Sequence, residues 1–147
     1  MYNLLHMSEF DVGSEPKGGI FRGIWEKFKH NQERNLESKT GGDLDKISDE
    51  WAKNGFAAVK AGGGAMLSEL VSLGMATTAD NLRATVDFAR DIGRLDLVPN
   101  LIREAELNTI GGVILLVLGA VLTGKTLYDA AKYSVQRDYW EFKRKHP

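Results

Sequence analysis

A phosphate-binding pattern occurs near the carboxyl end of the sequence. Residues 119–126 read Gly-Ala-Val-Leu-Thr-Gly-Lys-Thr, which fits the G-x-x-x-x-G-K-[ST] spacing of a nucleotide-binding loop. In such a loop, backbone N–H groups surround the phosphates, the lysine contacts them and the hydroxyl coordinates Mg²⁺. The chemistry would be the binding of a nucleoside triphosphate.

The residues around this match do not support that chemistry. Its middle positions are Ala, Val, Leu and Thr, whereas a working loop needs small, flexible residues. The residues after Thr126 read as one amphipathic helix, with no strand to supply an acidic partner for Mg²⁺. Nucleotide binding at residues 119–126 is therefore a distant alternative to a chance match in a glycine-rich helix.

Other patterns that could do chemistry are weaker still. His6, His30 and His146 lie far apart in the sequence, and none has a partner four residues away, so we predict no metal site. The chain has no cysteine, which excludes disulfides and thiolate metal sites. We predict that the protein is not an enzyme and uses no cofactor, and the sequence identifies no small-molecule substrate.

Composition places the chain among folded, nearly neutral proteins. It has 147 residues, with 19 basic and 20 acidic side chains. A chain of this length can bury a core without a metal or a cross-link, and a hydrophobic fraction of 43% excludes wholesale disorder. Nucleic-acid-binding domains usually carry a clear basic excess, so we predict no nucleic-acid partner.

Residues 107–124 are the most distinctive segment, because none of them is charged. A charged residue at the centre of a membrane helix costs about 2.5–3.5 kcal/mol. Crossing a bilayer takes about 20 residues, with roughly 17 as the lower limit, so the segment is just long enough. The alternatives are a buried helix of a soluble protein or a buried strand, since residues 113–118 are an unbroken aliphatic run.

Small residues predict that this segment packs closely on another helix. Gly112, Gly119 and Thr123 follow one another at spacings of seven and four, which lets a second backbone approach one face. The partner helix could belong to the same chain or to another subunit. The residues predicted to form the membrane anchor are Ile110, Val113, Leu115, Leu116, Leu118, Val121 and Leu122.

The charge balance predicts an orientation for a single-pass membrane protein. Six basic and three acidic residues follow residue 124, which places the C-terminus on the cytoplasmic or matrix side. We recognise no amino-terminal targeting signal in the sequence. This orientation therefore requires about a hundred residues to cross the membrane without one.

The remaining residues before the apolar segment predict short helices. Residues 1–19 are glycine-containing and polar, and we expect an extended arm. Residues 20–106 would form a helical interaction region that starts with an amphipathic helix over residues 20–28 and a polar connector over residues 31–42. The aromatic residues of the first helix either pack on the core or lie at a membrane interface; they are Phe21, Trp25 and Phe28.

Glycine, threonine and proline positions predict further boundaries. Asp43 or Asp45 is suited to cap a helix, and the three glycines in residues 61–65 predict a break, a hinge or a close helix crossing. Thr78 is predicted to start another helix, which ends at Gly93. A later helix would begin with Pro99 in its first turn, and Gly111 and Gly112 would join it to the apolar segment.

The carboxyl-terminal part, after an apolar helix over residues 107–126, is predicted to be a basic amphipathic tail helix over residues 127–147. Its apolar residues share one face and would dock on a partner; they are Tyr128, Ala131, Val135, Tyr139 and Phe142.

Together these patterns predict an all-α protein, in which several short amphipathic helices precede one long C-terminal helix with an apolar first half. The favoured function is a non-enzymatic subunit of a membrane-associated assembly, with other protein subunits and the lipid membrane as partners. The alternative is a soluble all-α bundle, a pore-forming or assembly component, with residues 107–124 as its buried core helix.

Overall fold

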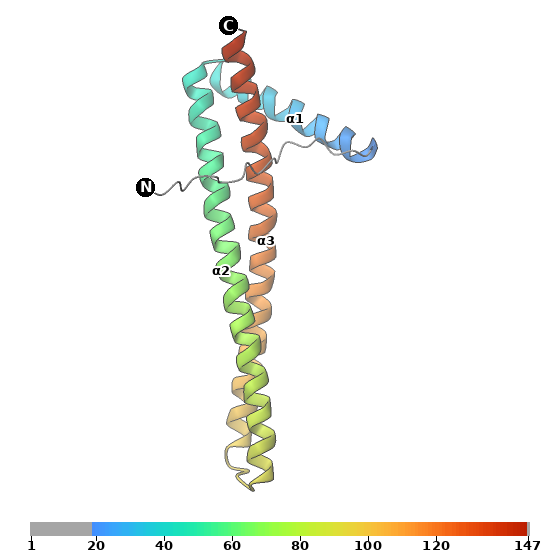
Figure 1. Ribbon diagram of the computed structural model, residues 1–147, viewed down its shortest axis with the longest axis vertical. Coiled ribbons are helices and arrows are strands. Elements are labelled where there is room, and N and C mark those ends of the chain that lie inside the picture. The colour runs from blue at the N-terminus through green and yellow to red at the C-terminus, as the bar shows by residue number, and fades with distance from the viewer. Residues whose placement is uncertain (1–18, 147) are drawn as a thin grey trace, which may run out of the picture. The chain divides into compact units, whose positions relative to one another are not determined.

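Three α-helices form the part of the chain that the structure describes. The computed structural model describes residues 19–146, which fold into α1 (Gly19–Thr40), α2 (Leu44–Asp91) and α3 (Val98–Lys145) (Figure 1). The all-α prediction is confirmed, and the last helix is long with an apolar first half. The strand alternative is wrong, because residues 113–118 lie inside α3. The predicted arm lies outside the described residues except for Gly19, which opens α1.

The chain divides into two compact units. Unit 1 comprises Met1–Ala57 together with Tyr128–Pro147, and unit 2 comprises Ala58–Leu127. The described part of unit 1 therefore contains α1, the first turns of α2 and the last turns of α3. Unit 2 contains the rest of α2 and α3, which lie side by side and antiparallel in it (Figure 1).

Local hydrogen bonds explain where α2 begins and ends. The carboxylate of Asp43 accepts hydrogen bonds from the backbone N–H groups of Asp45 (3.0 Å) and Lys46 (3.3 Å), so Asp43 caps the helix, as the sequence predicts. At the other end, Gly93 adopts a φ of 75°. The N–H of Arg94 donates to the carbonyl of Ala89 (2.8 Å), which completes a glycine-based C-terminal cap.

The polar connector predicted over residues 31–42 is wrong, because α1 continues to Thr40. Gln32, Leu36 and Thr40 are spaced four residues apart and are all buried, so one face of this polar stretch packs on the rest of unit 1. Tertiary packing of this face stabilises the helix, although the polar composition of residues 31–40 predicts a loop. The helix ends at Thr40, and the next two residues, Gly41 and Gly42, have φ angles of 64° and 80°, which suit glycine.

The glycine run in residues 61–65 does not interrupt α2, which continues through to Asp91. A Cβ atom at Gly62 would lie 3.4 Å from Cγ2 of Thr126, and one at Gly64 would lie 3.2 Å from Cδ1 of Leu122. Gly62 and Gly64 therefore provide the close helix crossing, whereas a Cβ at Gly63 would meet open space. The predicted break fails because contact with α3 outweighs a propensity cost of about 1 kcal/mol per glycine.

Two other predicted boundaries are also wrong. Thr78 does not start a helix, since it lies inside α2 and its hydroxyl donates to the carbonyl of Gly74 (2.9 Å), one turn back. Gly111 and Gly112 do not form a joint, since α3 runs unbroken from Val98 with Pro99 in its first turn. Glycine and threonine at these positions lie within continuous helices rather than at helix ends.

Unit 1 has its own core. The large side chains that are almost fully buried are Leu36, Ile47 and Val135. The ring of Trp51 on α2 contacts those of Tyr133 and Trp140 on α3, with centroid distances of 5.3 and 6.5 Å. The side-chain amide of Asn54 donates to the side-chain oxygen of Gln136 (2.7 Å). The first turns of α2 and the last turns of α3 thus form one packed body with α1.

Candidate functional site

A seam of small residues joins α2 and α3 in unit 2. The buried residues of α2 here recur every three or four positions, or after seven; they are Ala58, Ala61, Ala65, Ser68, Ser72, Ala79, Val86 and Ala89. On α3 the buried residues recur every seven; they are Ala105, Gly112 and Gly119. A repeat of seven residues keeps the contact on one face of both helices along their length.

Two of the predicted packing residues, Gly112 and Gly119, lie against the backbone of α2. A Cβ at Gly112 would lie 3.4 Å from the backbone oxygen of Ser72, and one at Gly119 would lie 3.6 Å from that of Ala65. A larger side chain at either position would meet backbone, which cannot rotate away as a side chain can. Thr123 is exposed and lies outside this contact.

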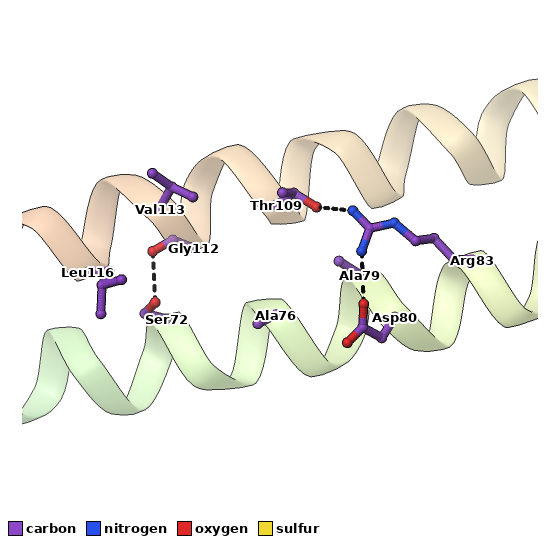
Figure 2. Close-up of a pocket in the computed structure, with 9 residues that line it drawn as sticks. All are labelled: Ser72, Ala76, Ala79, Asp80, Arg83, Thr109, Gly112, Val113 and Leu116. Atoms are coloured by element: carbon purple, nitrogen blue, oxygen red, sulfur yellow. Dashed lines mark hydrogen bonds and ion pairs between the residues drawn. The ribbon is translucent and has the colours of Figure 1, made fainter.

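A hydrogen bond crosses the seam at Gly112. The hydroxyl of Ser72 donates to the carbonyl oxygen of Gly112 at 2.7 Å, and both residues are buried (Figure 2). The bond joins a side chain of α2 directly to the backbone of α3. Sequence reasoning missed Ser72, although its place in the three- and four-residue spacing of small residues was visible.

Removal of this hydroxyl should loosen the helix pair slightly. We expect Ser72→Ala to lower the free energy of unfolding by about 0.6–1 kcal/mol, since interhelical hydrogen bonds contribute about this much and alanine fits the same space. The matched control is Thr77→Ala, whose hydroxyl bonds within its own helix, to the carbonyl of Leu73 (3.0 Å). Denaturation in detergent micelles measures both changes, and equal effects would contradict a role for the cross-helix bond.

The large apolar side chains lie on the outside of this helix pair. Those exposed on α2 are Met66, Leu67, Leu70, Val71 and Leu73. Those exposed on α3 are Leu107, Ile110, Val113, Ile114, Leu116, Val117, Leu118 and Val121. Water-soluble helix pairs bury their large apolar residues and expose polar ones, so unit 2 has the opposite arrangement. Contiguous exposed apolar surface is typical of membrane or protein contact sites.

Most of the predicted anchor residues belong to this outer surface. Leu115 and Leu122 are half-buried, and the other five are exposed. Of the 18 most apolar consecutive residues of α3, 11% are buried within the chain. Residues 107–124 are therefore not a buried core helix of this chain, which removes that form of the soluble alternative. Among residues 19–146, α3 is the one helix that, by its own length and composition, is apolar enough to cross a membrane.

Charged residues bound this surface at both ends. We define the apolar band as residues 61–79 of α2 and 107–124 of α3. Lys60 and Lys125 flank it at one end, and Asp80 and Glu106 flank it at the other, because the helices are antiparallel. Within the band, Glu69 of α2 is the one charged residue in the sequence. The band is thus a nearly neutral zone between two charged rims.

A small pocket of about 190 Å³ lies where the band meets the acidic rim (Figure 2). The guanidinium of Arg83 donates to the carboxylate of Asp80 and, across the helix pair, to the hydroxyl of Thr109, both at 2.8 Å. Val113 and Leu116 line the apolar side of the same pocket. An arginine that is already paired beside an apolar wall suits a boundary between apolar and aqueous surroundings better than it suits catalysis.

The predicted docking residues of the tail helix lie in unit 1, and part of their face is used within this chain. Val135 is almost fully buried, and Ala131 and Tyr139 are half-buried. Tyr128 and Phe142 are more than half exposed. The ring of Tyr128 nevertheless meets that of Phe28 on α1 edge-on, at 5.9 Å between centroids. Much of the docking face thus packs inside unit 1.

The first turns of α1, in contrast, expose several apolar side chains. Trp25 and Phe28 stack on one another, at 5.6 Å between ring centroids, and both are half-buried. Phe21 is 70% exposed, and its neighbours Ile20 and Ile24 are 80% and 60% exposed. The start of α1 is therefore an apolar surface that the described residues do not cover.

An ion pair joins α1 to α3 in unit 1. The ammonium of Lys143 lies 3.1 Å from the carboxylate of Glu37. The hydrogen bond from Lys143 and the positive charge of Lys143 lower the pKa of Glu37. The same hydrogen bond and the negative charge of Glu37 raise the pKa of Lys143. The contribution of Glu37 to stability is present above its unfolded-state pKa and is lost as pH falls through its folded-state pKa. That of Lys143 is present below its unfolded-state pKa and is lost as pH rises through its folded-state pKa.

The replacement Lys143→Gln tests this pairing. We expect the titration midpoint of the Glu37 carboxyl, followed by NMR, to rise toward the ordinary value for glutamate, because the hydrogen bond and charge that favour the ionised form are gone. The effect on stability should be small, since both groups are accessible to solvent. An unchanged midpoint would show that the pair does not persist in solution.

The phosphate-loop match at residues 119–126 lies inside α3. Its backbone N–H groups are therefore used in helix hydrogen bonds and cannot surround a phosphate. The hydroxyl of Thr126, which would coordinate Mg²⁺, donates instead to the carbonyl of Leu122 (2.8 Å). The nucleotide-binding alternative is wrong for this reason.

The distinctive feature of unit 2 is therefore the apolar band, with small residues between its two helices, large apolar residues outside and charged rims at both ends. The large apolar residues of α2 do not indicate how it packs on α3, because Leu67, Leu70 and Val71 form a stripe on its exposed face. The small residues at heptad spacing were the signal. No family model, curated protein or solved structure matches the chain.

Proposed function

We propose that the protein is a non-enzymatic helical subunit of a membrane-associated assembly, anchored by residues 107–124 of α3. The observation that supports this most is the inverted side-chain distribution of unit 2, with small residues inside and large aliphatic residues outside. Without a hydrophobic driving force between them, membrane helices associate through small residues and close backbone contact. Water-soluble helices are stabilised by burying the large residues that unit 2 exposes.

The dimensions of the segment agree with a bilayer. Eighteen residues of α-helix are about 27 Å long at 1.5 Å per residue, and the hydrocarbon core is about 30 Å thick. Lys125 follows the segment directly, and a lysine at this position can extend its ammonium toward the headgroups. Glu106 precedes the segment, so both ends leave the hydrocarbon at a charged residue.

The start of α1 is the surface that we assign to other protein subunits. Its exposed apolar residues are Ile20, Phe21 and Ile24. They lie on α1 in unit 1, whereas the apolar band belongs to unit 2. The charge balance supports a cytoplasmic or matrix location for residues 125–147, where basic residues outnumber acidic ones by six to three.

Alkaline carbonate extraction of cell membranes tests the anchor. Carbonate releases proteins that are bound to a membrane surface and retains those embedded in the bilayer. We expect the full chain to stay in the membrane pellet, because residues 107–124 expose aliphatic side chains that prefer hydrocarbon to water. Release of the chain into the supernatant would remove the proposal.

The assembly role has a separate test. After solubilisation in a mild detergent, the wild-type chain should sediment as a complex larger than one copy. Ile24→Asp should reduce that size but leave retention in the carbonate pellet unchanged, because Ile24 lies outside the apolar band. The matched control is Asn35→Asp, which adds the same charge at an exposed position of the same helix and should leave the size unchanged. Sedimentation of the wild type as a single copy would contradict the assembly role.

A further inference from the structure

We propose that residues 61–79 of α2 cross the same bilayer beside residues 107–124 of α3. The two segments would then form a transmembrane helical hairpin, in place of a single span. Residues 80–106 would lie on one side of the membrane, and the segments before residue 61 and after residue 124 would lie together on the other. This inference rests on the proposed function, because it requires residues 107–124 to be in the bilayer.

The composition of unit 1 requires an even number of crossings. Its contacts join residues before the apolar band to residues after it, as the Asn54–Gln136 hydrogen bond (2.7 Å) and the Glu37–Lys143 ion pair (3.1 Å) show. Partners in a hydrogen bond cannot lie on opposite sides of a bilayer. If residues 107–124 cross once, another segment between residues 57 and 128 must therefore cross back.

Residues 61–79 are the segment that can do this. They contain one charged residue, whereas residues 80–106 contain ten. Their nineteen residues make about 28 Å of helix, close to the length of the segment in α3. Lys60 and Asp80 flank them directly, so the apolar stretch ends at a charge on both sides.

The register of the helix pair places the two apolar segments side by side. A Cβ at Gly62 would lie 3.4 Å from Thr126, at one end of the band. Ser72 donates to Gly112 at 2.7 Å, nearer the other end. Because the helices are antiparallel, residues 61–79 accompany residues 107–124 along nearly their whole length, and both enter and leave hydrocarbon at the same levels.

The outer face of α2 is also apolar over this length. Met66 and Leu67 are each 66% exposed and Leu70 is 64% exposed, and all three lie inside the band. Aliphatic side chains on both helices thus form one surface around the band. A bilayer supplies a partner for that whole surface, whereas a crossing by α3 alone would leave the outer face of α2 in water.

Glu69 is the one charged residue of residues 61–79, which also contain two serines and two threonines, so this part of α2 is less apolar than residues 107–124 of α3. Glu69 is exposed, but the start of its side chain lies near α3, since a Cβ at Gly119 would lie 3.1 Å from Cγ of Glu69. Ionisable residues inside membranes usually face a neighbouring helix or a water-filled cavity, so Glu69 is the least favourable residue of the proposed span. On composition alone, α3 is the candidate span among the described residues, and α2 would cross as its packed partner.

The charges agree with this topology. Residues 80–106, which connect the two spans and would be translocated across the membrane, carry four basic and six acidic side chains. This connection is short and has a net charge of −2. Both chain segments on the other side would be flanked by lysine, at residues 60 and 125. This distribution follows the positive-inside rule.

Cysteine labelling tests the topology directly, because the natural chain contains no cysteine and needs no background substitution. The single variants are Ser38→Cys, Asn100→Cys and His146→Cys, each at an exposed position. A membrane-impermeant maleimide is applied to sealed vesicles that contain the full-length chain, before and after permeabilisation. The wild-type chain, which should take no label, is the control.

We expect positions 38 and 146 to be labelled under the same condition and position 100 under the opposite one. Labelling of 38 with 100, and of 146 on the other side, would show a single crossing by α3; the proposed anchor would survive and the hairpin would fail. Labelling of all three on one side would also overturn the hairpin. If carbonate then released the chain, the anchor would fail too, and if the chain stayed in the pellet, the anchor alone would survive.

Discussion

Replacement of Val117 by arginine is expected to move the ratio of membrane-embedded to released chain toward release by roughly 100-fold or more. Val117 lies near the middle of residues 107–124 and is 60% exposed on the outer face of the apolar band. Arginine at the centre of a membrane helix costs about 2.5–3.5 kcal/mol, and valine there is slightly favourable. Each 1.4 kcal/mol corresponds to about a tenfold change in an equilibrium constant.

The same substitution has the opposite expectation in water. An exposed valine on a soluble helix can become arginine with a change in stability within about 0.5 kcal/mol, and the added charge favours solubility. Leu95→Arg is the matched control, since Leu95 is 66% exposed but lies outside the band, in the connection between α2 and α3. Carbonate extraction measures both variants. Full retention of Val117→Arg in the pellet, or an equal loss for Leu95→Arg, would contradict insertion of the band into lipid.

Gly112→Leu is expected to lower the free energy of unfolding of the helix pair by about 2–3 kcal/mol. A Cβ at this position would already be in van der Waals contact with the backbone oxygen of Ser72 (3.4 Å) and Cβ of Met75 (3.6 Å), so we expect the larger side chain of leucine to push the helices apart. Overpacking of a filled interface typically costs about 1–3 kcal/mol. The separation of the helices would also break the Ser72–Gly112 hydrogen bond.

A control on the same helix distinguishes this effect from a general effect of leucine. Gly124 has open space where a Cβ would be added, and it is exposed. Gly124→Leu should leave stability unchanged or raise it by up to about 1 kcal/mol, since leucine favours a helix more than glycine does. Denaturant titration in micelles gives both values. Equal values for Gly112→Leu and Gly124→Leu would show that the small-residue seam does not hold the pair together.

The sequence predicted the fold class and the segment of greatest interest because both depend on local patterns. Residues 107–124 are neutral and aliphatic whatever they pack on, and the helical spacing of apolar residues continues through Tyr139. The cap at Asp43 was also predictable, because a capping side chain bonds to backbone only two and three residues away. These features need no knowledge of distant contacts.

The length of α2 could not be predicted in this way. The glycines of residues 61–65 weaken a helix in water, and the contacts of Gly62 and Gly64 with Thr126 and Leu122 on α3 are too distant in the sequence to be predicted from it. The face that α2 buries could not be predicted either, because the usual expectation is that large residues such as Leu70 face a partner helix, whereas Leu70 is exposed. That expectation holds in water, where burial of large apolar residues stabilises the fold, and it reverses where the surroundings are apolar.

The water accessibility of the apolar band is the most direct test of the central claim. A nitroxide spin label attached to Val117→Cys in lipid vesicles reports collisions with oxygen, which concentrates in hydrocarbon, and with a water-soluble nickel complex. A label on Asn100→Cys provides the aqueous reference. We predict that oxygen collisions dominate at position 117 and nickel collisions at position 100. Nickel collisions at position 117 equal to those at position 100 would show that the band lies in water.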